Sequence, residues 1–254
     1  MSESGWKNVE IDNDRGQKLA GVLYATGLAA APVLVVCHGF TGSKEGGGKA
    51  LEMGEYLAET GYDVLLFDFS GSGGSEGDFE DTTLTGQIGD LASVVGWCER
   101  SGAGPVVTMG RSFGGTTAIA QAASDERVRA VCTWAAPADP FKLFQGVVRP
   151  DTAESERVAL VGEGGDEVWI KRDFLRDLRA YDIPALAAQV SPRPLFVIHG
   201  DDDETVPAQE ARNIFLAAEE PKELKFIRGG DHRFTENHRQ VWDQCRQWLR
   251  GLEL

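Results

Sequence analysis

A serine placed between two glycines is the first feature of the sequence that could carry out covalent chemistry. Ser112 is the centre of residues 110–114, Gly-Arg-Ser-Phe-Gly, which match the pattern G-x-S-x-G. An apolar run (105–109) precedes the pattern and a run of small residues (115–123) follows it. Glycines between a strand and a helix allow the sharp turn that presents a serine as a nucleophile. Taken alone, the pattern also fits a glycine turn whose serine caps a helix.

A nucleophilic serine needs a general base, and the chain has four histidines. His38 and His199 each close an apolar run as His-Gly, which favours a structural role. His238 falls inside a predicted helix, where we expect it to face solvent. His232 lies in a Gly-Gly-Asp-His loop before that helix, where an imidazole can reach a serine at a strand end. We therefore predict His232 as the base.

The third member of such a site is a carboxylate that orients the histidine. Residues 201–204, Asp-Asp-Asp-Glu, lie between the serine and the histidine in the chain, which is the order that this arrangement requires. Only one carboxylate can occupy the dry position behind the imidazole, and the residue pattern leaves Asp202 and Asp203 open. The other interpretations are a solvated acidic turn before a helix and a cation site, but no calcium-loop spacing is present.

The elements that must position these residues alternate along the chain. The predicted strands are 6–12, 19–24, 32–37, 62–67, 105–109, 128–134, 194–198 and 224–227. The predicted helices are 49–60, 84–99, 113–123, 208–218 and 235–250. Near-continuous Val, Ile and Leu runs indicate strands buried on both faces. We therefore predict an α/β fold with a mostly parallel central sheet flanked by helices, in which the first two strands pair antiparallel.

Residues 135–189 interrupt this alternation. The segment has no clear strand, two early prolines and five spaced aromatic residues: Phe141, Phe144, Trp169, Phe174 and Tyr181. It is too long for a plain loop in a compact domain, so we predict an inserted helical cap. The catalytic domain then comprises 1–134 and 190–254. A cap over the serine predicts an enclosed, mostly apolar pocket, which favours small substrates.

Composition narrows the classes of partner. The 254 residues are 42% hydrophobic, which argues against disorder, and the net charge of −15 disfavours nucleic acid and anionic membranes as partners. No apolar stretch reaches the ~18 residues of a membrane helix. The N-terminus lacks a signal core and the four cysteines are scattered, so we expect a cytoplasmic protein with reduced thiols; a homodimer is left open. The glycine-rich segment 42–49 lacks the P-loop positions, so no nucleotide cofactor is expected.

Together these motifs resemble those of the α/β-hydrolases, in particular the small bacterial cinnamoyl and feruloyl esterases. The matching segments are 38–41 (His-Gly-Phe-Thr), 67–77, the serine turn, 199–207 and 230–232. The resemblance implies that the acid is Asp203 and that the backbone amides of Phe40 and Phe113 form the oxyanion hole. Many relatives carry histidine where this chain has Arg111, so that position departs from the family.

The resulting expectation is a serine hydrolase that cleaves small soluble esters, with short or medium acyl groups or aryl groups. Ser112, His232 and Asp203 would act through an acyl-enzyme, and no cofactor or metal would be needed. Peptide hydrolysis, thioester hydrolysis and acyl transfer would use the same residues. A non-catalytic binding protein of the same fold is the alternative from a different class.

Overall fold

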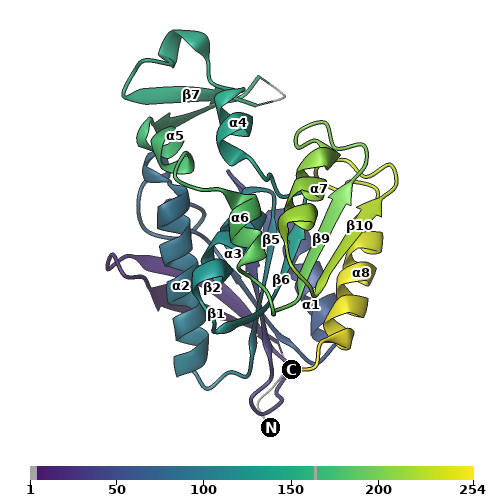
Figure 1. Cartoon of the computed structure of the whole chain (residues 1–254). Coiled ribbons are helices and arrows are strands. Elements are labelled where there is room, and N and C mark those ends of the chain that lie inside the picture. The colour runs from purple at the N-terminus through teal and green to yellow at the C-terminus, as the bar shows by residue number, and fades with distance from the viewer. Residues whose placement is uncertain (1–4, 163–164) are drawn as a thin grey trace.

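The computed structural model describes residues 5–162 and 165–254, which build one large twisted sheet with helices on both sides (Figure 1). The spatial order of the strands in this sheet is β1-β2-β4-β3-β5-β6-β9-β10. The bounds are β1 Gly5–Asp12, β2 Lys18–Ala25, β3 Val33–Cys37, β4 Asp63–Phe67, β5 Val106–Arg111, β6 Val128–Trp134, β9 Leu195–Gly200 and β10 Lys222–Ile227. From β4 to β10 all pairs are parallel, whereas β2 is antiparallel to both β1 and β4.

The central strands are the apolar runs of the sequence, buried on both faces. Val35 in β3 pairs with Leu65 of β4 on one side and with Thr108 of β5 on the other, and all three are fully buried. Such strands need helices over both faces of the sheet, because either face left open would expose a row of aliphatic side chains. The predicted α/β fold with a mostly parallel sheet is confirmed.

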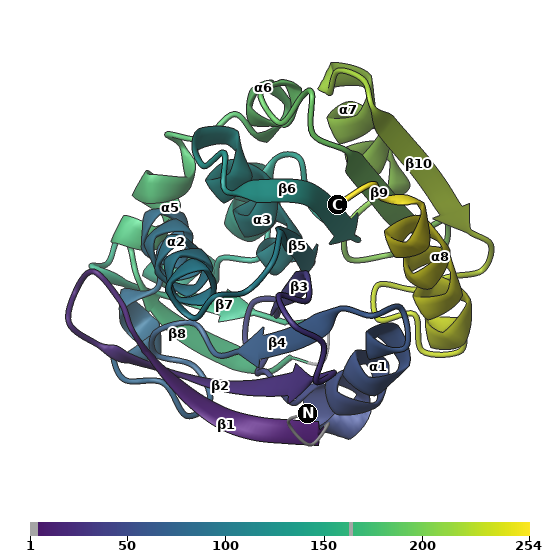
Figure 2. The ribbon, with the colours of Figure 1, turned by 90° about the horizontal axis from the view of Figure 1, so that it is seen from below.

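The helices divide between the two faces of the sheet, as Figure 2 shows from below. Buried side chains of α1 and α8 pack on one face, and those of α2, α3, α6 and α7 pack on the other. The bounds of these helices are α1 Lys49–Ala58, α2 Leu84–Arg100, α3 Phe113–Ser124, α6 Ile183–Ala188, α7 Ala208–Ala217 and α8 His238–Gly251. The amphipathic α8 illustrates the pattern, since Trp242, Cys245 and Leu249 recur at helical spacing and are buried.

Most of the segment predicted as a helical cap lies above the carboxyl ends of the parallel strands, whereas its last helix, α6, packs beside α3 and α7 on the sheet (Figure 1). It contains the short helices α4 (Pro140–Gln145) and α5 (Asp173–Leu178), and also an antiparallel pair of strands, β7 (Arg157–Val161) and β8 (Glu167–Lys171). The expectation of no strand in this segment is therefore wrong. The missed signal is the alternation in β8, where Ile170 is buried between exposed neighbours.

The last helix begins three residues later than predicted. One carboxylate oxygen of Asp231 accepts hydrogen bonds from the backbone N–H groups of Arg233 and Thr235, at 3.1 and 2.8 Å. This local bonding offers the backbone an alternative to the helix, so α8 starts only at His238. The resulting loop keeps His232 outside regular secondary structure.

The four cysteines, Cys37, Cys98, Cys132 and Cys245, are free thiols and all are buried. Burial raises the pKa of the Cys37 thiol well above its ordinary value and that of Cys98 to about 12. Thiols that stay protonated are poor nucleophiles, so Cys37 and Cys98 act as small apolar groups.

Candidate active site

Ser112 occupies the turn between β5 and α3. Its backbone has φ 52° and ψ −125°, and a positive φ is uncommon outside glycine. The turn needs its glycines, because a Cβ on Gly110 would lie 2.2 Å from the carbonyl oxygen of Gly114. A Cβ on Gly114 would in turn lie 2.4 Å from the carbonyl oxygen of His38. The predicted strand–turn–helix around Ser112 is confirmed, and its strain is of the kind that proteins retain at functional turns.

The imidazole of His232 bridges the serine and the carboxylate. Its Nε2 lies 3.1 Å from Oγ of Ser112, and its Nδ1 lies 2.9 Å from Oδ2 of Asp203. When Nδ1–H donates to the carboxylate, Nε2 is left as an acceptor for the serine hydroxyl. The three side chains come from distant parts of the chain, yet they form one hydrogen-bonded series. This arrangement can remove a proton from Ser112.

The carboxylate of Asp203 is held on both of its oxygens. Oδ1 accepts hydrogen bonds from the backbone N–H groups of Thr205 and Val206 at 3.0 and 2.7 Å, while Oδ2 faces His232. Burial by itself raises the pKa of Asp203, but hydrogen bonds from His199 and His232 outweigh it and hold the pKa well below its ordinary value. Asp203 is therefore a buried, ionised group with a fixed orientation.

The neighbouring carboxylates have a different environment. Asp201, Asp202 and Glu204 are exposed, whereas Asp203 is only 7% exposed. One oxygen of Asp201 accepts a hydrogen bond from the backbone N–H of Gly229 at 2.6 Å, which ties this turn to the loop of His232. Of the two candidates that the residue pattern left open, Asp203 is the one beside His232.

His199 packs against Asp203 and is fully buried. Its Nε2 lies 2.8 Å from the carbonyl oxygen of Val206 and 3.3 Å from Oδ2 of Asp203. A donor at Nε2 thus supports the same carboxylate oxygen that faces His232. Residue spacing alone does not predict this contact, because the three residues between His199 and Asp203 must first form a turn.

His38 and His238 lie away from this series. Nδ1 of His38 lies 2.8 Å from the carbonyl oxygen of Gly39, and its Nε2 accepts a hydrogen bond from the N–H of Phe69 at 3.1 Å. Burial lowers the pKa of His38, which favours the neutral form that both contacts require. His238 starts α8, where its ring packs on Trp242 with centroids 5.2 Å apart.

The two backbone amides expected at the oxyanion hole, those of Phe40 and Phe113, belong to adjoining segments. Phe113 is the first residue of α3, directly after the serine. Phe40 follows Gly39, and a Cβ on Gly39 would lie 3.4 Å from Cβ of Ser112. The loop after β3 therefore runs against the serine turn, and the rings of Phe40 and Phe113 are 6.0 Å apart. Backbone N–H groups at a helix start and in a neighbouring loop can stabilise an oxyanion.

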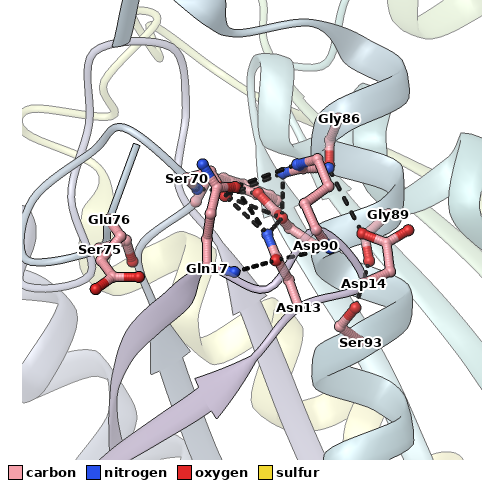
Figure 3. A network of polar contacts seen from close by, with 12 residues as sticks. Asn13, Asp14, Gln17, Ser70, Ser75, Glu76, Gly86, Gly89, Asp90 and Ser93 are labelled. Atoms are coloured by element: carbon pink, nitrogen blue, oxygen red, sulfur yellow. Dashed lines mark hydrogen bonds and ion pairs between the residues drawn. The ribbon is translucent and has the colours of Figure 1, made fainter. Parts of the chain in front are cut away.

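Buried carboxylates fix the loops behind this site, a feature that sequence analysis missed. Asp68 is fully buried and accepts hydrogen bonds from Nζ and the backbone N–H of Lys44 at 2.8 and 2.6 Å. Asp90 on α2 accepts from the amide of Asn13, from Arg15 and from the backbone N–H of Ser70 (Figure 3). Phe69 contacts His38, and its two neighbours Asp68 and Ser70 are both anchored by these bonds. They therefore fix the position of the loop after β3.

Aromatic side chains fill much of the space between the site and the cap. The rings of Phe40, Phe113, Phe144 and Phe174 pack on one another with centroid distances from 4.8 to 6.0 Å. Phe144 of α4 and Phe174 of α5 are buried, so they join the cap to the main domain. Of the predicted cap aromatics, these two act as core residues.

The enclosed pocket expected over Ser112 is not confirmed. A pocket of about 390 Å³ lies in the cap and is lined by residues of α4, α5 and the segments between them, such as Phe141, Leu175 and Arg179. A second pocket of about 220 Å³ lies near the amino-terminal end of the sheet. Neither of these two pockets is lined by Ser112, Asp203 or His232.

Within residues 5–162 and 165–254, no group of three or more His, Cys, Asp or Glu side chains is arranged to hold a metal ion. The carboxylates of 201–204 do not converge, since Asp203 turns inward and its neighbours turn to solvent. In the same part of the chain, no helix has the length and apolar character needed to cross a membrane.

Comparison with known proteins gives a match over half of the chain. The sequence profile of the alpha/beta hydrolase fold matches residues 32–159, from β3 through the serine turn into the cap. At the sequence level the chain is 27% identical over 224 residues to the putative esterase YitV of Bacillus subtilis, covering 80% of this chain and 84% of that protein.

Solved structures agree with this match. Est1E from Butyrivibrio proteoclasticus, determined with ferulic acid bound, superposes with a TM-score of 0.84 at 22% identity and covers 95% of this chain and 97% of its own. The esterase domain of a Rhodothermus marinus protein superposes with a TM-score of 0.76 at 27% identity, covering 97% and 98%.

Proposed function

The chain belongs to the alpha/beta hydrolase fold family, and on that premise we propose that it is a serine carboxylesterase acting on small esters. The observation that carries the proposal is the hydrogen-bonded series from Ser112 through His232 to Asp203, at 3.1 and 2.9 Å. A scaffold used only for binding has no physical need for a strained serine, a loop imidazole and a buried carboxylate in that order. This is the main argument against the non-catalytic alternative.

In the proposed mechanism, Oγ of Ser112 attacks the ester carbonyl carbon as Nε2 of His232 takes the hydroxyl proton. The carbonyl oxygen becomes an oxyanion, which the amides of Phe40 and Phe113 stabilise. When the intermediate collapses, the bond to the alcohol oxygen breaks and His232 donates its proton to the departing alcohol. Water then repeats the sequence on the acyl-serine, giving the carboxylic acid and the free serine. Asp203 keeps Nδ1 of His232 protonated throughout and stabilises the imidazolium.

Esters are proposed ahead of peptides and thioesters because the similar proteins described above are esterases by name. Ferulic acid, the ligand bound in the Est1E structure, supports aryl acids as one class of acyl group. Peptide hydrolysis, thioester hydrolysis and acyl transfer use the same residues, so they differ only in substrate binding.

A substrate series tests the proposed ester class. We expect hydrolysis of p-nitrophenyl acetate and butyrate and much slower hydrolysis of palmitate, because a sixteen-carbon chain needs a long apolar channel. Methyl esters of hydroxycinnamic acids and a fluorogenic peptide set complete the series. Faster cleavage of peptides than of esters would assign the protein to the peptidases, and preference for palmitate would contradict the small-substrate proposal.

The nucleophile is tested by Ser112→Ala with a matched Ser101→Ala control. Ser101 is exposed and lies between α2 and the start of β5, whereas Ser112 follows the end of β5. We expect Ser112→Ala to lose at least about 10³-fold in kcat, to retain its thermal unfolding transition and to lose labelling by a fluorophosphonate. Ser101→Ala should match the wild-type protein in all three measurements. Undiminished turnover by Ser112→Ala would refute the mechanism.

A further inference from the structure

Two arginines are the sequence neighbours of Ser112 and His232. Arg111 precedes Ser112 at the end of β5, and Arg233 follows His232 in its loop. A Cβ atom built on Gly39 would lie 3.8 Å from Nη2 of Arg111 and 3.4 Å from Cβ of Ser112. Both groups thus border one glycine, which places the Arg111 guanidinium next to the nucleophile.

No carboxylate within the described residues forms an ion pair with either guanidinium, although the chain carries 40 acidic residues. The nearest carboxylate in sequence, Asp231, accepts from the backbone N–H of Arg233 rather than from its side chain. Arg111 is partly buried, whereas Arg233 is exposed. Burial and then the charge of Arg233 lower the pKa of Arg111, so the Arg111 guanidinium is partly desolvated and also feels a second positive charge.

Such an arrangement is unfavourable in the free protein. A partly buried cation without a counter-ion costs free energy, and a second cation nearby adds to that cost. By contrast, Arg149 in the cap has two carboxylate partners at 2.8 and 2.6 Å. An unpaired guanidinium beside a nucleophile can bind an anionic group of a substrate and release it with the product. Arg suits this role because it forms bidentate hydrogen bonds with carboxylates.

We propose that Arg111 and Arg233 bind a carboxylate group of the substrate, so that the preferred esters carry a negative charge in addition to the scissile bond. This inference rests on the proposed esterase function and specifies its substrate class. The net charge of −15 repels such substrates at long range. A local pair of cations at the reacting centre offsets that repulsion only for esters whose carboxylate reaches the pair.

Two matched ester pairs test the proposal by placing the anion on either side of the scissile bond. Ethyl hydrogen glutarate and ethyl pentanoate differ in an acyl-side carboxylate, and 4-acetoxybenzoate and 4-acetoxybenzamide differ in an alcohol-side carboxylate. The measurement is the ratio of kcat/KM for the anionic ester to that for its neutral partner. We expect this ratio to exceed 1 for at least one pair, and to fall as NaCl is raised because salt screens the attraction.

Variants then assign the preference to these residues. In the favoured pair, Arg111→Gln and Arg233→Gln should each lower the ratio by roughly 10- to 100-fold, the effect of losing a charge-assisted hydrogen bond. Arg111→Lys should retain part of the preference for the anionic ester. Arg250→Gln, an equal charge change on an exposed residue in the last turn of α8, should leave the ratio unchanged. A purely structural role would alter both esters equally and leave the ratio constant in every variant.

Equilibrium binding separates this inference from the esterase proposal. Calorimetric titration of the Ser112→Ala protein with 4-acetoxybenzoate, 4-acetoxybenzamide and ethyl hydrogen glutarate needs no turnover. Tighter binding of the anions that is lost on Arg111→Gln would support the inference even if no ester is cleaved. Cleavage of neutral esters with ratios at or below 1 in both pairs, or ratios unchanged by both Gln variants, would overturn the inference and leave the esterase proposal intact.

Discussion

Replacing Asp203 with asparagine should inactivate the protein through the tautomer of His232. Oδ1 of Asp203 accepts two backbone N–H groups, from Thr205 and Val206. An asparagine must therefore keep its carbonyl oxygen at that position, because an NH₂ group there would face two donors. Its NH₂ then occupies the place of Oδ2, 2.9 Å from Nδ1 of His232. An NH₂ group can only donate, so Nδ1 becomes an acceptor and the proton moves to Nε2, where it faces Ser112.

The size of the loss follows from this exchange. A histidine with its proton at Nε2 cannot accept the serine proton, and comparable triads lose about 10⁴ in kcat, or roughly 5 kcal/mol of transition-state stabilisation. The loss of folding stability should be smaller than this loss of transition-state stabilisation. The new NH₂ also faces Nε2 of His199, which lies 2.8 Å from the carbonyl oxygen of Val206 and donates to it. Two opposed buried donors cost about 1–3 kcal/mol of the free energy of unfolding.

The matched control is Asp202→Asn. Asp202 is the exposed neighbour of Asp203, and its substitution changes the charge by the same amount. Steady-state hydrolysis of p-nitrophenyl butyrate measures kcat, and urea unfolding followed by circular dichroism measures stability. We expect Asp202→Asn to remain within about threefold of wild type, as surface substitutions do. A severe loss in Asp202→Asn together with a mild one in Asp203→Asn would refute the assignment of the acid.

Two further predictions concern pH and the serine turn. The value of kcat/KM should fall on acidification, because a protonated imidazole cannot act as the base; initial rates that do not change with acidification would argue against a histidine base. Since the pKa of Asp203 is lowered by folding, its stabilising contribution should be present at neutral pH and lost as the pH falls below about 4, which urea unfolding in acid would reveal. Gly114→Ala should destabilise the protein by several kcal/mol or abolish folding, because its Cβ would lie 2.4 and 2.5 Å from two backbone oxygens; a thermal unfolding midpoint equal to that of wild type would contradict the close approach.

Local sequence patterns predicted most of the scaffold and the reacting groups. All eight strands of the main sheet appear within about two residues of the predicted bounds, because buried strands need apolar runs that are visible in the sequence. The serine turn was predictable for a related reason. Gly110, Ser112 and Gly114 fall between a strand and a helix, and only glycine fits the two close approaches.

The carboxylates show where residue patterns stop being informative. Asp202 and Asp203 are chemically identical neighbours, and only the turn closed by Thr205 and Val206 directs one inward. Asp68 and Asp90 are buried as completely as aliphatic residues. Their partners, Lys44 and Asn13 among them, lie far away in sequence. A buried charge is tolerated when its partners are in place, and partners of this kind are fixed by tertiary structure rather than by spacing.

The cap shows the same limit for apolar residues. Phe144 and Phe174 could equally have lined a pocket or filled a core, since an aromatic ring suits both. In the folded chain each packs on both Phe40 and Phe113, at centroid distances of 4.8, 5.3, 5.4 and 5.6 Å. The rings that contact the loop after β3 are therefore also those that join the cap to the main domain. Substrate space over Ser112 therefore depends on how α4 and α5 sit against that loop. Substrate preference is consequently better sought in the unpaired charges beside the serine than in the apolar composition of the cap.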